Sequence, residues 1–292
     1  MLRSMTGYGR AEITLGEKLL SAEIRSLNGK QIDLLLKVPA PLKPYEFEIR
    51  NIINEHLQRG SIECTIALKL NGTAKPASIN LELVKAYFHQ LNALAHELKA
   101  DDHQLLASIL RLPDVVAAST ELLNEREWSG FKKTLMDAIN MLNQHRTDEG
   151  NVLETELRLR IANIVALQKK IVQLEPLRKE KIRENLLKLL HEYVNKEAGV
   201  DMNRFEQELI YYIEKIDLTE EQVRLSNHCN YFISLLDEQE INKGRKLSFL
   251  LQEIGREINT TGSKAYDAAI QKCVVEMKDE LEKAKEQVLN VL

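Results

Sequence analysis

Residues 128–174 read WSGFKKTLMDAINMLNQHRTDEGNVLETELRLRIANIVALQKKIVQL. Apolar residues recur in this stretch at three- and four-residue spacing, which is typical of an amphipathic helix. It holds no proline and, past its first turn, a single glycine, Gly150. Pro176 follows where a second long helix would start. The pattern predicts a long helical hairpin over residues 128–200. A stripe of that length is expected to need a partner, either in a bundle or in another copy of the chain.

The residues before this hairpin have a different periodicity. Apolar and polar residues alternate in three runs, which indicates half-buried strands; the runs are Leu20–Ile24, Ile32–Val38 and Ile62–Leu68. Asn28-Gly29 lies between the first two runs and predicts a hairpin turn. Helices are expected over residues 45–57 and 80–98, with a short one near 104–111.

After residue 200 the pattern is helical throughout. Helices are expected over residues 202–215, 218–237, 245–260 and 264–291, with the last break at Gly262. The predicted fold class is therefore α+β. Residues 1–127 form a mixed sheet and helix domain, residues 128–200 form the hairpin that acts as a spacer and oligomerisation element, and residues 201–292 form a helical domain.

Composition limits the class of protein. Hydrophobic residues make up 44% of the chain and charged residues 29%, as in a soluble globular protein with a core. No apolar run approaches the length of a membrane span, and the first residues lack the apolar core of a secretory signal. The three cysteines are odd in number and far apart, which argues against a disulfide framework or a paired-thiol zinc site. We expect a cytoplasmic protein without a membrane partner.

The segment Lys243–Lys264 reverses the sign of the charge. The chain carries −4, whereas this segment has five basic and two acidic residues and hence +3. Its two acids, Glu253 and Glu257, are four residues apart, so they share one side of a helix. Two carboxylates at this spacing can hold Mg²⁺ or Mn²⁺ beside a phosphate. The bases that can engage such a phosphate are Arg245, Lys246, Arg256 and Lys264. The alternative is that these are solvated surface charges that pair with one another.

A second constellation lies on the helix before this segment. Glu221, Arg224 and His228 fall at positions i, i+3 and i+7, on one helix face. A carboxylate beside an imidazole can fix its tautomer and raise its basicity, which suits general acid–base catalysis. The alternative is a histidine that is simply hydrogen-bonded.

Six ordered blocks of sequence resemble one family. The blocks are Met1–Ala11, Glu23–Asn28 with Asp33-Leu34, Arg59–Cys64, Asp148–Gly150 with Leu153, Glu221–His228 and Gly244–Lys264. Together they run from end to end of the chain and resemble the YicC/YloC family of bacterial endoribonucleases.

The resemblance implies metal-dependent cleavage of RNA inside a homo-oligomeric ring, a hexamer. It also implies roles for the candidate residues. Glu253 and Glu257 hold the divalent cation, and His228, with Glu221, acts in acid–base catalysis or as a further ligand. The phosphate contacts come from Arg224, Arg245, Lys246, Arg256 and Lys264, while Arg10, Arg25 and Lys30 guide RNA on the N-terminal domain. Two other hypotheses stay open at this point, a non-catalytic RNA-binding adaptor of RNA turnover and a structural scaffold.

Overall fold

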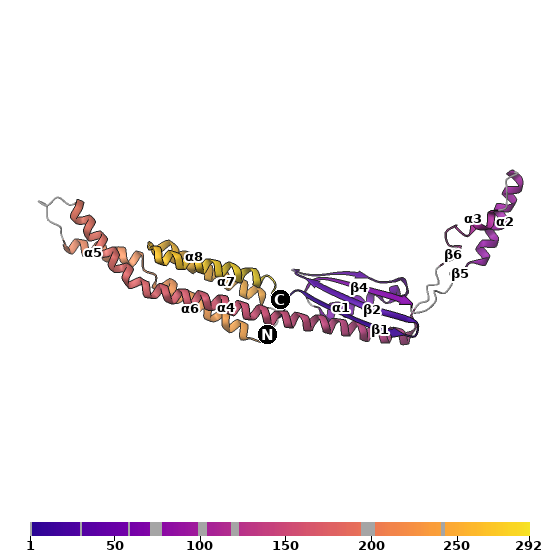
Figure 1. The fold of residues 1–292 in the computed structure, drawn as a ribbon, viewed down its shortest axis with the longest axis horizontal. Coiled ribbons are helices and arrows are strands. Elements are labelled where there is room, and N and C mark those ends of the chain that lie inside the picture. Colours follow the sequence, from indigo (N-terminus) through magenta and orange to yellow (C-terminus); the bar gives the residue numbers. More distant parts are fainter. Residues whose placement is uncertain are drawn as a thin grey trace.

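The computed structural model describes residues 2–29, 31–57, 59–70, 78–98, 104–117, 123–193, 202–240 and 243–292. It confirms the α+β class, with a mixed sheet, then one long helix, then further helices (Figure 1). The strands are β1 (Gly7–Leu15), β2 (Lys18–Leu27), β3 (Ile32–Lys37), β4 (Gly60–Leu70), β5 (Ser78–Ile79) and β6 (Val116–Ala117). The helices are the 3₁₀ turn η1 (Ala40–Tyr45), α1 (Glu46–His56), α2 (Leu81–Leu98), α3 (Leu105–Ile109), α4 (Glu125–Tyr193), α5 (Met202–Lys215), α6 (Thr219–Asp237), α7 (Gly244–Ala265) and α8 (Ala268–Val288). No helix in the described part of the chain is long and apolar enough to cross a membrane.

The four-stranded sheet has the order β1-β2-β4-β3, and only the β3–β4 pair is parallel. The hairpin turn therefore joins β1 to β2, with Gly16 at a φ of +62°. The hairpin predicted at Asn28-Gly29 is wrong, because β4 lies between β2 and β3. Asn28 instead donates its side-chain amide to the backbone oxygen of Leu289 at 2.8 Å. A Cβ on Gly29 would lie 2.8 Å from the backbone nitrogen of Ser61, so the glycine permits a close approach of two segments.

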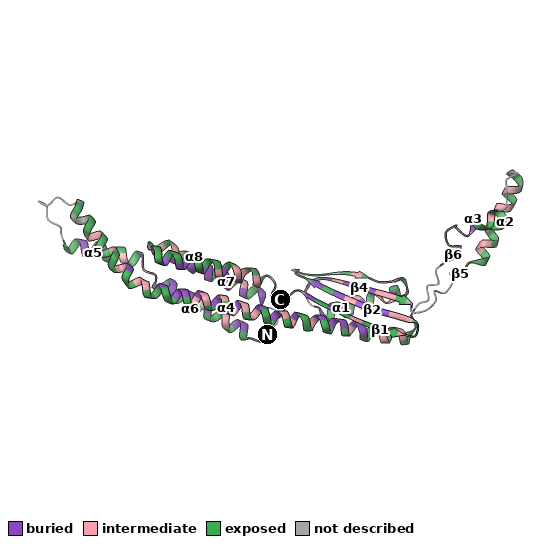
Figure 2. Ribbon diagram, in the orientation of Figure 1, coloured by how far each residue is buried: buried purple, intermediate pink, exposed green. Residues whose placement is uncertain are grey.

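One face of this sheet is covered by helices (Figure 2). Alternate residues of β2 and β4 are buried there, which follows from the two-residue period of a strand. They pack against α1 and the first third of α4; the central members are Leu20, Ile24, Ile62, Cys64, Ile49, Ile53, Phe131 and Leu135. Trp128 stacks on Tyr45 with a ring separation of 4.2 Å. On the other face, residues of β1 and β2 such as Tyr8, Arg10 and Arg25 are exposed in the described part of the chain.

Helix α4 is a single helix of 69 residues, which at 1.5 Å per residue is about 100 Å long. The prediction of a hairpin within residues 128–193 is wrong, since Pro176 lies inside the helix. A proline removes one backbone hydrogen bond from a helix. Side chains of α4 that follow Pro176 contact α5 and the residue directly after it. Arg178 donates to the backbone oxygen of Ile216 at 2.5 Å, and Arg183 pairs with Glu206 of α5 at 2.8 Å.

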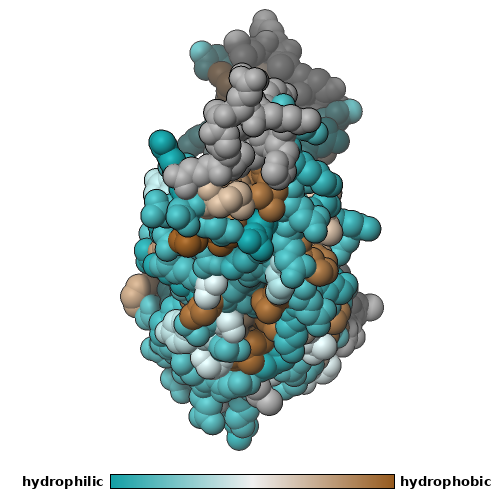
Figure 3. Space-filling view, turned by 90° about the vertical axis from the view of Figure 1, so that its left-hand side faces the viewer, coloured by the Kyte–Doolittle hydropathy of each residue, from teal (hydrophilic) through white to brown (hydrophobic). Residues whose placement is uncertain are grey.

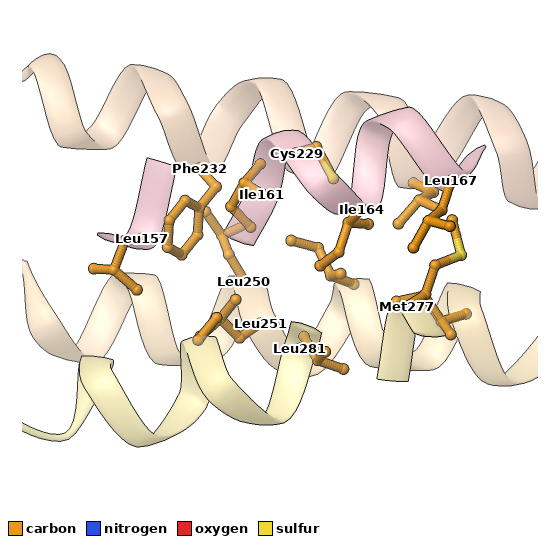
Figure 4. Packing of buried hydrophobic residues seen from close by; sticks show 14 of the residues in the cluster. Leu157, Ile161, Ile164, Leu167, Cys229, Phe232, Leu250, Leu251, Met277 and Leu281 are labelled. Atoms are coloured by element: carbon orange, nitrogen blue, oxygen red, sulfur yellow. The ribbon is translucent and has the colours of Figure 1, made fainter. Parts of the chain in front are cut away.

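The middle of α4 forms a helical unit with α6, α7 and α8. Their apolar faces share one core (Figure 4), in which Phe232 and Cys229 of α6 lie beside Ile161 and Ile164 of α4. The break between α7 and α8 is at Tyr266-Asp267 and not at the predicted Gly262, which is inside α7. Asp267 caps α8, because its Oδ1 accepts from the backbone nitrogens of Ala269 and Ile270 at 2.9 and 3.0 Å.

The sheet and the helical unit meet where the two ends of the described chain run side by side. The backbone N–H of Leu292 donates to the backbone oxygen of Arg3. The backbone oxygen of Leu292 accepts from the backbone N–H groups of Lys243 and Gly244, at the start of α7. Arg146 of α4 is buried at the same junction and donates to Ser26 Oγ at 2.5 Å. Burial, and then the neighbouring charge of Arg3, lowers the pKa of Arg146 to about 10. The backbone and this guanidinium together fix the two units along α4.

Candidate active site

Helices α6 and α7 run antiparallel and bring two of the predicted blocks together. Lys264 Nζ lies 2.8 Å from Glu221 Oε1, which ties the first turn of α6 to the last turn of α7. His228 is seven residues after Glu221, and Glu257 is seven residues before Lys264. Because the rise per residue is the same in both helices, this register places His228 and Glu257 at the same level. We call the line of these four residues the α6–α7 seam.

The two predicted metal-binding glutamates have different surroundings. Glu257 is buried, with 4% of its surface exposed, and has no ion pair or hydrogen bond among the described residues. Glu253 has 48% of its side chain exposed and lies 4.0 Å from Arg256. One helical turn therefore separates a glutamate that the fold largely covers from a solvated one. Surface charge pairing describes Glu253 but not Glu257.

Polar atoms without partners gather at the end of the seam where α6 begins. Nine buried side-chain atoms in the described part of the chain lack a hydrogen bond, and six of them belong to Arg178, Glu221, Gln222 and Thr261. Glu221 Oε2 is one of these atoms, as are both amide atoms of Gln222. Buried polar groups normally have a partner, so this concentration is typical of a site that binds water, an ion or a ligand.

Three of these residues, Arg178, Gln222 and Thr261, have no role in the sequence-based predictions. Thr261 lies one turn after Glu257, and the helical period itself could have identified it. Gln222 carries no such signal, because only the packing reveals its burial: Gln168 of α4 donates to its backbone oxygen at 2.6 Å.

Asp217 also belongs to this region. It pairs with Lys179 at 3.0 Å and accepts from the Thr219 backbone at 3.2 Å. Burial acts to raise the pKa of Asp217, but the bonds from Thr219 and Lys179 outweigh it and hold the pKa at about 2.

Of the predicted residues, Glu221, His228, Glu257 and Lys264 form the seam, whereas Arg245 and Lys246 lie in the first turn of α7, at its other end. His228 is half-buried, and Glu221 hydrogen-bonds Lys264 rather than His228. Lys264 also donates to the backbone oxygen of Asp217 at 3.2 Å, so this ammonium group is held by protein oxygens and is not free to meet a phosphate. The remaining basic side chains are exposed; Arg224 pairs with Glu220 at 2.5 Å, Lys246 with Glu240 at 2.5 Å, and Arg245 lies over Phe249.

The predicted RNA-guiding residues of the N-terminal domain lie far along α4 from the seam. Arg10 pairs with Glu12, and Arg25 pairs with Glu23 at 2.6 Å, all on the face of the sheet away from α1 and α4. Lys30 lies outside the described residues. Each arginine is therefore neutralised locally, and the face carries little excess charge to attract a phosphate backbone.

The oxygen atoms on the α6–α7 seam are of the type that binds a hard cation such as Mg²⁺, but there are few of them. Carboxylate and hydroxyl oxygens are the ligands of Mg²⁺, and those of Glu221, Glu257 and Thr261 include atoms without a protein partner. Within the described ranges, no group of three or more His, Cys, Asp or Glu side chains converges as a metal site. A cation on the seam would take its other ligands from water, substrate phosphate or a second chain. Burial raises the pKa of the Cys229 thiol to about 12.

Residues 2–155 match the N-terminal region, and residues 171–292 the C-terminal region, of the family described as endoribonuclease YicC-like. A probable endoribonuclease YicC of Clostridioides difficile (strain 630) is 29% identical over 294 residues, and one of Haemophilus influenzae (strain KW20) is 30% identical over 297. Both matches cover 100% of this chain and of the relative. The chain therefore belongs to the endoribonuclease YicC-like family.

Proposed function

We propose that this chain is an endoribonuclease that cleaves RNA phosphodiester bonds with the help of a divalent cation, that it acts as a homo-oligomeric ring, and that the α6–α7 seam holds the reacting phosphate. The RNA-cleaving activity is supported by family membership and by the names of two relatives of full length. The location rests on a single observation: Glu221 Oε2 is buried without a hydrogen bond among the described residues, on the helix that faces the largely covered Glu257.

Glu221 Oε2 is buried without a hydrogen bond among the described residues, and leaving a buried polar atom unpaired costs about 1–3 kcal/mol. A cation or a substrate group that completes the site would offset this cost. Glu257 and Glu221 Oε2 would be the ligands of such a cation. When bound, Mg²⁺ or Mn²⁺ would polarise the phosphate and offset the charge that develops on it.

The other seam residues have distinct tasks in this proposal. His228, at the level of Glu257, is placed to take or give a proton at the reacting oxygens. Arg256 and Arg224 are exposed beside the seam and would contact phosphate oxygens, which arginine binds through paired N–H groups. Lys264 holds Glu221 in position and does not contact the RNA.

The ring is supported by apolar residues that α4 leaves uncovered. Val152 and Leu159 are one heptad apart on α4 and are 67% and 52% exposed. A stripe at this spacing suits a second helix. The mass of the purified protein by light scattering tests this part: a monomer at all concentrations rejects the ring.

Cleavage of a labelled RNA tests the site. The wild type is expected to cut with Mn²⁺ or Mg²⁺ and to stop with EDTA. Glu257→Gln should reduce cutting by two orders of magnitude or more, by analogy with loss of a group that acts on the developing charge. Glu276→Gln, an exposed glutamate of α8, is the matched control and should cut normally.

Two outcomes would change the proposal. If Glu257→Gln folds and cuts like the wild type, the seam is not the active site. If the wild type binds RNA but leaves it intact with every divalent cation, the chain is an adaptor and not a nuclease.

A further inference from the structure

The outer face of α7 carries a stripe of which the site described above uses only Arg256. Arg245, Phe249, Gln252 and Arg256 are spaced by four, three and four residues, so they lie on one side of the helix. All four are exposed. The opposite side of α7 supplies the core through residues such as Leu247, Leu251 and Ile254. The stripe therefore faces solvent along most of the helix.

Phe249 is the unusual member of this stripe. An aromatic ring normally favours burial, but 55% of Phe249 is exposed, although α7 has a complete apolar face on its other side. The guanidinium carbon of Arg245 lies 5.7 Å from the centre of the ring. Arg245 has no ion pair among the described residues, so its charge is available. The planar ring of Phe249 and the planar guanidinium of Arg245 thus lie next to each other on the surface.

A second exposed ring lies close by on α6. Tyr231 is 53% exposed. The register that pairs Glu221 with Lys264 puts Tyr231 at the level of Ile254 of α7, about 8 Å along the helix axis from Phe249. The two exposed rings therefore lie within two helical turns of each other along α6 and α7.

We propose that Phe249, with Arg245 and Tyr231, forms a stacking surface for the bases of single-stranded RNA, next to the catalytic seam. Base stacking on aromatic rings is the general means of holding unpaired nucleic acid without reading its sequence, and arginine planes take part in it. The inference rests on the proposed function, since it assigns the substrate as an RNA strand with unstacked bases.

Charge and position favour RNA over a protein partner. The stripe contains Arg245 and Arg256 but no acid, although Glu253 beside it lies 4.0 Å from Arg256. Arg245, which has no ion pair among the described residues, can therefore attract a polyanion, whereas Arg10 and Arg25 on the sheet face are each paired with a glutamate. Phe249 is eight residues before Glu257, about 12 Å along the helix axis. A base stacked on Phe249 would thus belong to a nucleotide beside the cut and not to the reacting one.

Binding in EDTA tests the stacking surface without cleavage. Fluorescence anisotropy measures the affinity of the full chain for a labelled single-stranded RNA of twelve nucleotides. Phe249→Ala is expected to weaken binding by about 5- to 150-fold, the range for loss of one stacked base, and Phe249→Trp to keep it. Phe47→Ala is the matched control, because Phe47 is 74% exposed on α1 and should not affect binding.

A probe without bases separates stacking from phosphate contact. A sugar–phosphate oligomer of the same length should bind Phe249→Ala and the wild type equally. The proposal is overturned if Phe249→Ala binds RNA normally, if the loss is equal with the probe that lacks bases, or if the loss accompanies a fall in oligomeric mass.

The two proposals fail separately. A wild type that never cuts RNA but needs Phe249 to bind it rejects the nuclease and keeps the stacking surface. A wild type that cuts RNA and binds it equally well without Phe249 rejects the stacking surface alone.

Discussion

Lys264 Nζ lies 2.8 Å from Glu221 Oε1, across the gap between the last turn of α7 and the first turn of α6. Only 7% of the Glu221 side chain is exposed, against 31% of Lys264. The ammonium group holds one carboxylate oxygen, while Oε2 is buried without a hydrogen bond. The pair thus orients Glu221 and leaves one oxygen for a further partner.

Replacing Lys264 with methionine should impair cleavage without touching the substrate. We expect Lys264→Met to lower kcat about 10- to 100-fold, the range for groups that orient a metal ligand. Glu221 would then be buried and unpaired, so the free energy of unfolding should also fall. That fall should be less than the roughly 3–5 kcal/mol of a fully buried pair, because Lys264 is partly exposed. Cleavage assays and urea denaturation measure the two effects.

Two further variants distinguish orientation from stability. Lys264→Arg should keep most of the activity. The double variant Glu221→Gln with Lys264→Met should recover stability but not cleavage. Recovery of full cleavage in the double variant would show that Glu221 has no role in the reaction.

Gly150 should be far less tolerant of substitution than Gly130, although both lie in α4. A Cβ on Gly150 would lie 2.2 Å from the backbone oxygen of Leu2, whereas one on Gly130 would meet the flexible side chain of Leu15 at 3.1 Å. Gly150→Ala should destabilise the chain by about 1–3 kcal/mol or more, the cost of overpacking. Gly130→Ala should change the free energy of unfolding by less than about 1 kcal/mol. Equal effects in chemical denaturation would contradict the packing of the N-terminal segment against α4.

Asp217 should contribute to stability at neutral pH and lose that contribution in acid. Its pKa is lowered from the ordinary 3.8 to about 2 in the folded chain. A lowered pKa means that the native state binds fewer protons, so the contribution is complete above about pH 4 and disappears as the pH falls through about 2. Asp217→Asn should be less stable than the wild type at pH 7, and the difference should shrink below pH 4. A difference that is constant from pH 7 to pH 2 would rule out a role for the charge.

The buried thiols should be unreactive in the folded chain. Burial raises the pKa of both Cys64 and Cys229 to about 12. Because only the thiolate reacts readily, a thiol reagent at pH 8 should label neither residue until denaturant is added. Fast labelling of Cys229 in the native state would mean that the core of the helical unit opens readily.

The local pattern of the sequence determined most of the elements and few of their connections. Alternation placed the strands at Leu20–Ile24 and Ile62–Leu68 correctly, because a half-buried strand needs an apolar residue at every second position. The helix expected over residues 80–98 is α2, and Asn80 caps it, because its Oδ1 accepts from the backbone nitrogen of Leu83 at 3.2 Å. Asn28-Gly29 and Pro176 were misread as turn and break. The local preference of Asn28-Gly29 for a turn is overridden by contacts with Ser61 and Leu289, which are distant in the sequence. The local preference of Pro176 for a helix break is overridden within the continuous helix α4.

The sequence by itself determined which residue types stand at which helical spacing: Glu253 with Glu257, Glu221 with His228, and a basic excess around them. Its resemblance to a known family supplied the expected activity. Only the tertiary structure decided that Glu257 is buried and Glu253 solvated, that Lys264 belongs to Glu221, and that Thr261 and Gln222 lie in the same region. The reason is that burial and pairing depend on which helix lies opposite. Helical periodicity gives the face of a residue, but only the register between α6 and α7 gives its neighbour.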